Sequence, residues 1–190
     1  MKLARVAVFA LLCLVAACGR SDSPWHATDI TGAMPALDFA MTRANDGKAV
    51  GAGDYKGKVT LLYFGYTHCP DICPTTLANL GEVLQKLGTR ADDVRVLFVT
   101  VDPDRDGLAL MKGYVNSFAP QMDGLRGAPD QLIPLARRYR VAFSVTPGPP
   151  YEVMHSNAVF FFDKTGRARL VATETKDVDG LASDVEKLLQ

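Results

Sequence analysis

Two cysteines and two histidines are the residues of this chain with the clearest potential for chemistry. Cys69 and Cys73 lie four positions apart in the stretch THCPDICPT, and His68 directly precedes the first cysteine. His155 lies far downstream, ahead of an apolar run. Such residues can form a disulfide, carry out thiol exchange or bind a metal.

A purely structural disulfide between Cys69 and Cys73 would add little stability. In the chain-entropy model, closing a loop of about five residues contributes roughly 2 kcal/mol, against roughly 4.5 kcal/mol for a loop of about 85 residues. Apolar runs such as Leu61–Phe64 and Phe160–Phe162 predict a hydrophobic core that does not need a disulfide for its stability. The pair is therefore poorly placed as a structural crosslink.

Thiol redox chemistry is a stronger alternative for the two cysteines. Their spacing is C-x-x-x-C, whereas redox-active pairs of this kind commonly have C-x-x-C, and the extra residue alters the geometry of the loop. A peroxidase of the peroxiredoxin type would have a threonine three residues before its cysteine, where this chain has Tyr66. Of the two thiol activities, an oxidoreductase is therefore favoured over a peroxidase. The C-x-x-x-C spacing weakens the oxidoreductase interpretation without excluding it.

A metal site needs a further ligand besides the two sulfurs. The sequence has three histidines, of which His26 lies in a polar N-terminal segment, His68 adjoins Cys69, and His155 precedes a predicted strand. Two thiolates and one imidazole would suit Cu(I). The spacing alone leaves His155 open to a role in the core or at the surface. His26 is either a solvated linker residue or an accessory ligand.

The cysteines lie at the junction of a predicted strand and a predicted helix. Val59–Tyr66 is a nearly continuous apolar run, which is typical of a strand buried on both faces. Leucines and a valine then recur at helical spacing up to Leu87, and Gly88 is a C-terminal stop signal. The unpaired amides at the start of a helix favour a thiolate, so the junction predicts a lowered cysteine pKa.

The remaining pattern predicts an α/β domain with a thioredoxin-like fold, in which helices flank a central mixed β-sheet and a β-hairpin lies at the N-terminal end. The order is a hairpin, a strand–helix–strand unit, two helices, a second hairpin and a final helix. The predicted elements besides the strand and helix above are 37–42 with 49–50, 94–101, 108–118, 131–139, 158–162 with 168–173, and 178–189.

The N-terminus predicts export and a lipid anchor. Two basic residues precede the apolar run Val6–Ala17, which is shorter than the roughly 20 residues of a spanning helix. Val15–Cys18 reads VAAC and resembles the bacterial lipobox, although cleavage as an ordinary signal peptide also fits. We therefore predict a lipoprotein signal peptide at 1–17, lipid on Cys18, a flexible tether at 18–33 and one domain at 34–190.

Charge and cysteine content agree with an exported protein that does not bind nucleic acid. Loss of Lys2 and Arg5 with the signal would leave 19 basic and 21 acidic residues, a net charge of −2, with no basic footprint. The folded body would retain Cys69 and Cys73 as its cysteines, in a compartment that permits disulfides. We expect a monomer.

Three motifs together resemble the Sco/SenC family of copper-binding assembly factors for cytochrome c oxidase. They are Phe64–Thr75 (FGYTHCPDICPT), Val101–Asp106 (VDPDRD) and His155–Ser156 ahead of an apolar strand. The similarity spans nearly the whole body, from about Met34 to the C-terminus. It implies a thioredoxin-like domain tethered to a membrane and exposed to the periplasm or the mitochondrial intermembrane space.

The resemblance also implies the ligands. Copper, as Cu(I) and also as Cu(II), would bind through Cys69, Cys73 and His155, and the two cysteines would form a redox-active disulfide when oxidised. His68 belongs to the motif without being the usual ligand, and two aspartates, Asp71 and Asp102, would shape the site. Met154 departs from the family, which often has aspartate there; it would be an apolar filler or an axial thioether donor.

The predicted function is therefore that of a periplasmic, lipid-anchored copper chaperone for copper-centre assembly in cytochrome c oxidase. The expected partner is the copper-bearing subunit of the oxidase or another periplasmic copper chaperone. The alternative is a thiol:disulfide oxidoreductase that reduces the cysteines of a copper-receiving partner. Both functions require a reduced Cys69–Cys73 pair, because a disulfide sulfur is not a thiolate ligand.

Overall fold

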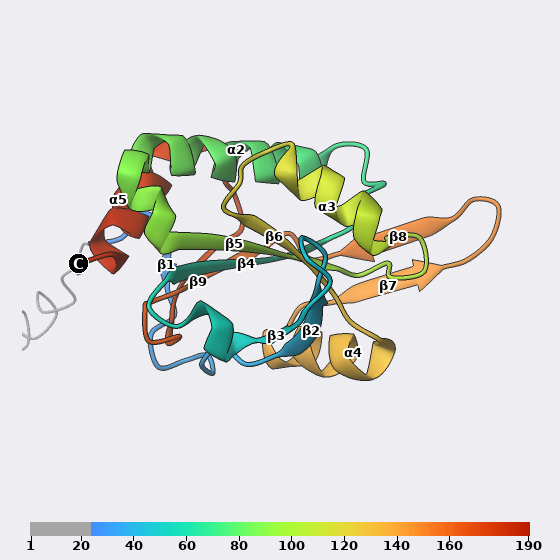
Figure 1. Cartoon of the computed structure of the whole chain (residues 1–190). Coiled ribbons are helices and arrows are strands. Elements are labelled where there is room, and N and C mark those ends of the chain that lie inside the picture. The colour runs from blue at the N-terminus through green and yellow to red at the C-terminus, as the bar shows by residue number, and fades with distance from the viewer. Residues whose placement is uncertain (1–23) are drawn as a thin grey trace, which may run out of the picture.

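An eight-stranded mixed β-sheet lies at the centre of residues 24–190, the part of the chain that the computed structural model describes (Figure 1). The strand order is β1-β10-β9-β4-β5-β6-β2-β3. β5 runs parallel to β4 and β6, and the other neighbours are antiparallel. The strands are β1 Thr28–Asp29, β2 Ala40–Arg43, β3 Ala49–Gly51, β4 Val59–Gly65, β5 Val94–Thr100, β6 Met122–Arg126, β9 Val159–Phe162 and β10 Ala168–Ala172.

The central strands β4 and β5 follow the apolar runs that predicted them. All seven residues of β4 are buried, and six of the seven in β5. Alternation sends Leu61 and Tyr63 to one side of the sheet and Leu62 and Phe64 to the other, where each pair joins a separate apolar cluster. A strand with two apolar faces needs cover on both, and this requirement sets the layering of the domain.

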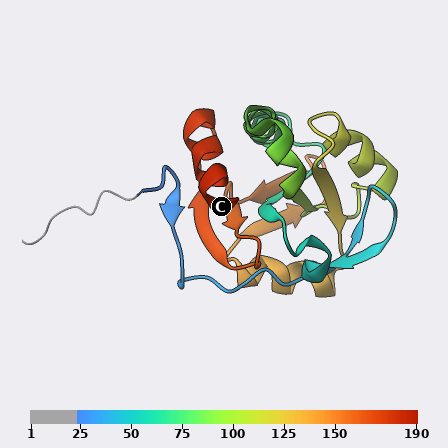
Figure 2. The same ribbon diagram turned by 60° about the vertical axis from the view of Figure 1, so that its left-hand side comes forward.

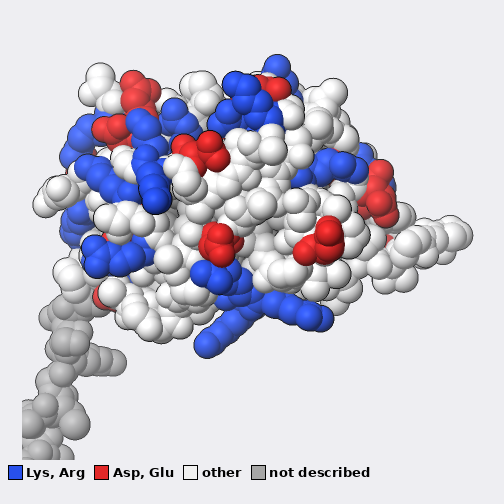
Figure 3. All heavy atoms as spheres, turned by 60° about the horizontal axis from the view of Figure 1, so that its bottom comes forward, with Lys and Arg blue, Asp and Glu red and all other residues white. Residues whose placement is uncertain are grey.

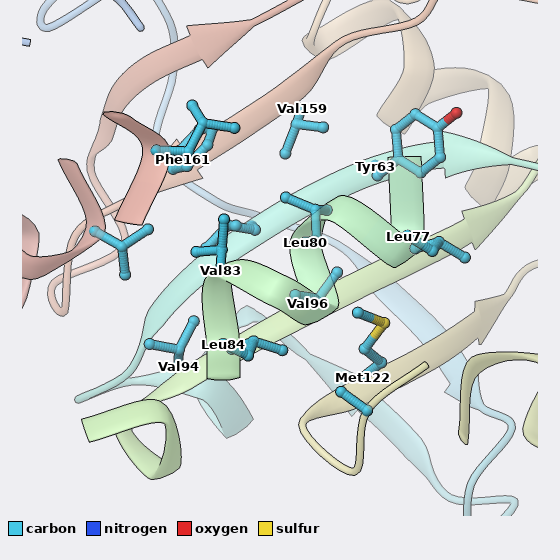
Figure 4. Close-up of a cluster of buried hydrophobic side chains, with 14 of the residues drawn as sticks. Tyr63, Leu77, Leu80, Val83, Leu84, Val94, Val96, Met122, Val159 and Phe161 are labelled. Carbon is cyan, nitrogen blue, oxygen red and sulfur yellow. The ribbon is translucent and has the colours of Figure 1, made fainter. Parts of the chain in front are cut away.

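Helices cover both faces of the sheet, so the domain has three layers. Figure 2 shows α2 (Ile72–Leu87), α3 (Leu108–Asn116) and α5 (Val178–Leu188) on one face of the sheet and α4 (Pro129–Arg138) on the other. Short 3-10 turns lie at Ala52–Tyr55 and Gly88–Asp93. In Figure 4 the inner face of α2 packs on the sheet through Leu77, Leu80, Val83 and Leu84. This packing fixes α2, and with it the cysteine that it carries.

The N-terminal segment of the described chain is part of the fold. β1 pairs with β10, and the backbone N–H groups of His26 and Ala27 donate to the fully buried carboxylate of Asp184, with the Ala27 bond at 2.8 Å. A flexible tether was predicted for residues 18–33, and the structure instead attaches residues 26–29 to the domain. The predicted signal peptide and Cys18 lie outside the described residues and stay predictions.

A second sheet has two strands, β7 (Phe143–Thr146) and β8 (Glu152–His155), and projects beyond the main sheet in Figure 1. This hairpin was not predicted from the sequence, in which His155 was placed ahead of a predicted strand. Strands β1 and β6 were not predicted either. β6 reads MDGLR, in which an aspartate and a glycine interrupt the apolar pattern, and β1 has only two residues.

The surface carries charges of both signs. The face that Figure 3 shows carries basic side chains together with acidic ones. Within residues 24–190, every helix is too short or too polar to cross a bilayer.

Candidate metal centre

Cys69 and Cys73 are brought together by the turn that leads from β4 into α2. β4 ends at Gly65 and α2 begins at Ile72, so Cys73 is the second residue of the helix and Cys69 lies just before it. Both thiols are free, Cys73 is fully buried, and Cys69 is 8% exposed. The backbone N–H of Cys73 donates to Sγ of Cys69 over 3.4 Å. The prediction of a pair at a strand–helix junction is confirmed.

Gly65 allows the start of α2 to approach the sheet this closely. A Cβ atom at this position would lie 2.9 Å from Sγ of Cys73 and 2.7 Å from the ring of Phe98. Both separations are shorter than ordinary contacts of a side chain, so any larger residue would displace the sulfur or the ring. This role of Gly65 was not predicted from the sequence.

His155 approaches the cysteines from the hairpin. It is the last residue of β8, and its Nε2 atom lies 3.3 Å from Sγ of Cys73. Its Nδ1 atom lies 3.1 Å from the carbonyl oxygen of Ser156, which can only accept, so Nδ1 carries the proton. In the neutral ring Nε2 then presents a lone pair toward the sulfurs, as a metal ligand must.

Two aromatic rings hold the imidazole in this orientation. The rings of Tyr63 and Tyr66 meet His155 edge to face, with centroids 6.2 Å and 5.8 Å away. Tyr63 comes from β4 and Tyr66 from the turn before Cys69, so the same segment that leads to the cysteines also contacts the histidine. Such pairs typically contribute about 0.5–1.5 kcal/mol beyond the area they bury.

Together the three side chains form a group with metal-ligand geometry. The two sulfurs and one imidazole nitrogen all lie within 4.8 Å of one another. With bonds of about 2.0–2.3 Å, three ligands around one ion are roughly 4 Å apart, so small side-chain shifts would close the site. Two soft thiolates and an imidazole suit Cu(I). The donor set therefore fits copper.

The two thiols differ in acidity. Burial raises the pKa of Cys73 to about 12. Burial also acts against the thiolate of Cys69, but the backbone N–H groups of Asp71 and Cys73 outweigh it and bring the pKa of Cys69 below its usual value. Burial lowers the pKa of His155, which keeps its ring neutral. The first thiolate thus forms at Cys69, and Cys73 ionises readily only when a positive charge such as copper compensates for its burial.

A buried carboxylate anchors the turn that carries Cys69. Asp106 is fully buried and accepts hydrogen bonds from the backbone N–H of Thr67 at 3.0 Å, from its hydroxyl at 2.5 Å, and from the hydroxyl of Thr100 at 2.6 Å. His68 lies 3.4 Å from the same carboxylate and is 48% exposed. Asp106 lies within the VDPDRD motif, but its anchoring role was not predicted from the sequence.

Asp102 lies in the loop that follows the next buried strand, β5, two residues beyond its end. It is 1% exposed and accepts a hydrogen bond from the hydroxyl of Tyr151 at 2.8 Å and another from the side chain of Arg105. It stands outside the Cys–Cys–His group. The structure thus agrees with a shaping role for Asp102, and it adds two partners that sequence reasoning missed.

Comparison with known proteins decides the family. The SCO1/SenC family model matches residues 31–190, which is most of the chain. This chain belongs to the SCO1/SenC family. The predicted resemblance and the predicted thioredoxin-like fold with a central mixed sheet are both confirmed.

Relatives of this Sco chain include proteins whose names mention copper or oxidase assembly. It is 42% identical over 118 residues to the mitochondrial SCO2 homolog of Mus musculus, covering 60% of this chain and 46% of that protein. It is 39% identical to ScoI of Bradyrhizobium japonicum with copper bound, with a TM-score of 0.74, covering 81% of this chain and 99% of that one. The chain spans about half the length of the curated relatives it matches.

A more distant structure shares the fold. It is of BsSco, described as having a disulfide switch and as a member of the Sco family of cytochrome c oxidase assembly proteins. Identity is 23%, the TM-score is 0.62, and the match covers 82% of this chain and 96% of that one.

Other residues considered for the Sco site lie away from the donor group. His26 pairs with Asp177 at the start of α5, with 3.3 Å between Nδ1 and the carboxylate. His68 and Asp71 are exposed beside the cysteine turn, outside the donor group. Met154 is 70% exposed, so it does not fill the core. Alternation along β8 turns it to the face opposite His155.

Proposed function

We propose that this chain binds one copper ion as cargo through Cys69, Cys73 and His155 and delivers it for copper-centre assembly in cytochrome c oxidase. The observation that carries the proposal is the convergence of two free thiols and an imidazole within 4.8 Å. The acceptor would be the copper-bearing subunit of the oxidase or another copper chaperone. A relative with copper bound and a relative described as an oxidase assembly protein support this assignment.

The residues of the site suit capture and release of Cu(I). Cys69 is the more readily ionised of the two thiols, the lone pair of His155 Nε2 is available before metal arrives, and Cys73 loses its proton as the ion binds. A site of three ligands leaves room for an incoming soft donor from the acceptor, so copper can pass without being released to water. Cu(II) would be a second bound state at the same ligands.

Thiol:disulfide exchange is a second candidate function, favoured by the difference between the two thiols. Cys69 is the more exposed sulfur and has the lowered pKa, as an attacking thiolate needs. It would attack a partner disulfide and form a mixed disulfide, and Cys73 would then attack Cys69. The products are a Cys69–Cys73 disulfide and a reduced partner dithiol.

The proposed place of action is the periplasm, with lipid on Cys18 as the anchor. The basic residues Lys2 and Arg5, the apolar run 6–17 and the residues VAAC support export and lipidation. Mass spectrometry of the mature N-terminus should find lipid on Cys18 and none in Cys18→Ser. An unmodified Cys18, or a terminus elsewhere, would contradict the anchor.

Complementation separates the two candidate functions. In a host that lacks its own copy and grows at low copper, His155→Ala should fail to restore oxidase activity, as Cys69→Ser and Cys73→Ser should. Added copper should rescue all three in part. Thiol exchange needs two sulfurs but no imidazole ligand. Full activity of His155→Ala alongside inactive cysteine variants would therefore select the thiol reductase instead.

A further inference from the structure

The hairpin that carries His155 has its own attachment to the rest of the domain. β7 and β8 pair with each other, from Phe143 with His155 at the base to Thr146 with Glu152 at the far end. Tyr151 directly precedes β8 and lies at that far end. Its hydroxyl donates to Oδ1 of Asp102 over 2.8 Å. This hydrogen bond joins the hairpin to the loop that follows β5.

Asp102 is a fixed point for this attachment. It is 1% exposed, and its backbone N–H donates to the hydroxyl of Thr100, the last residue of β5, over 3.0 Å. One carboxylate oxygen accepts from Tyr151 and the other from Nε of Arg105. A buried carboxylate that is held on both oxygens is a strong acceptor with little freedom to move.

The side chain of Arg105 packs on two aromatic rings near Asp102. Its guanidinium carbon lies 3.7 Å from the centre of the Tyr151 ring and 5.9 Å from the centre of the Tyr66 ring. Tyr66 in turn meets the ring of His155 edge to face at 5.8 Å. One cation therefore contacts an aromatic residue of the hairpin and an aromatic residue that packs on the imidazole.

The geometry points to a positioning role for Asp102, Arg105 and Tyr151, which we call the clasp. The clasp holds the hairpin against the domain and so keeps Nε2 of His155 within reach of the two sulfurs. This inference rests on the proposed copper site and deepens it, because it names what sets the position of the third ligand. None of the three clasp residues is part of the Cys–Cys–His donor group.

A clasp of this kind changes copper affinity through the position of the hairpin. The apparent affinity of a site falls in proportion to the fraction of molecules in the competent arrangement. Opening the clasp would withdraw the imidazole and leave two thiolates in place, a weaker site from which an acceptor could take the ion. The hydrogen bond to Asp102 also raises the pKa of Tyr151, which keeps its hydroxyl a donor at neutral pH.

The test is a double-mutant cycle on anaerobic Cu(I) affinity, measured by competition with a chromogenic chelator. Tyr151→Phe removes one hydroxyl and keeps the ring over Arg105, and Arg105→Lys removes the guanidinium from both rings. Each variant is made in the native chain and in His155→Ala. Tyr139→Phe is the matched control, since it removes a hydroxyl bonded to the backbone of Ala36 beside α4.

We expect Tyr151→Phe and Arg105→Lys to weaken Cu(I) binding about tenfold in the native chain, the scale of one hydrogen bond to a charged group. We expect less than about twofold change from either substitution once His155 is alanine, and none from Tyr139→Phe. Equal losses in both backgrounds, or unchanged affinity in the native chain, would overturn the clasp. If His155→Ala itself leaves affinity unchanged, the proposed copper site fails instead.

Discussion

The cysteine turn and the histidine hairpin hold their ligands in different ways. Cys73 is on a 16-residue helix whose inner face is packed into the core, and the turn before it is tied to the buried carboxylate of Asp106. His155 is on a two-stranded sheet that stands apart from the eight-stranded one, and alternate residues of both its strands are exposed. The two sulfurs therefore belong to the packed body of the domain, whereas the imidazole belongs to the β7–β8 hairpin, which we call the histidine arm.

In the proposed function, the two regions have different roles at a site that binds copper and then releases it. Local stability in a protein follows buried contacts, so the cysteine turn should be among the last segments to open and the hairpin among the first. Movement of the hairpin would change the number of ligands without disturbing the thiolates.

The largest effect should come from the sulfur at the centre of the rigid region. Cys73→Ser replaces a thiolate by a hydroxyl, a hard donor that does not bind Cu(I) well. We expect a loss of affinity greater than about 100-fold, because even residues that only support ligands cost about 10–100-fold. Chelator competition under anaerobic conditions measures it. Retention of near-native affinity would remove Cys73 from the site.

An intermediate effect should follow from loosening the cysteine turn. Asp106→Asn leaves the backbone N–H of Thr67 or a hydroxyl facing an amide donor, which should cost about 1–3 kcal/mol of unfolding free energy. Cu(I) affinity should fall by about tenfold or more. Urea unfolding and chelator competition report the two quantities.

Asp104→Asn is the matched control for Asp106→Asn, since Asp104 is exposed and two positions away. It should leave both quantities nearly unchanged. Equal behaviour of the two variants would show that Asp106 does not anchor the turn.

The smallest effect concerns the acidity of the two sulfurs in the metal-free, reduced protein. The lowered pKa of Cys69 means that its thiolate fraction rises at a pH below that of an ordinary thiol, about 8.5, whereas the pKa of Cys73 is raised to about 12. Alkylation should therefore modify Cys69 first at neutral pH, and its rate should rise with pH through the lowered pKa. Mass spectrometry locates the label. Labelling of Cys73 before Cys69 would contradict this prediction.

The sequence predicted the cysteine turn well and the hairpin poorly, for a physical reason. The strand, turn and helix around Cys69 and Cys73 are contiguous, so their periodicity and spacing are visible in a single stretch. The hairpin strands FSVT and EVMH are short, and the prolines and glycine between them read as loop. The contact between Tyr151 and Asp102 joins residues 49 positions apart, and no local pattern encodes it.

X-ray absorption at the copper edge tests the central claim, that the rigid cysteines and the histidine arm meet at one ion. Anaerobic protein loaded with one equivalent of Cu(I) should show two sulfur scatterers and one imidazole nitrogen. In His155→Ala the imidazole contribution should disappear while both sulfurs remain. An unchanged nitrogen shell in His155→Ala, or a native spectrum with sulfur alone, would contradict the account.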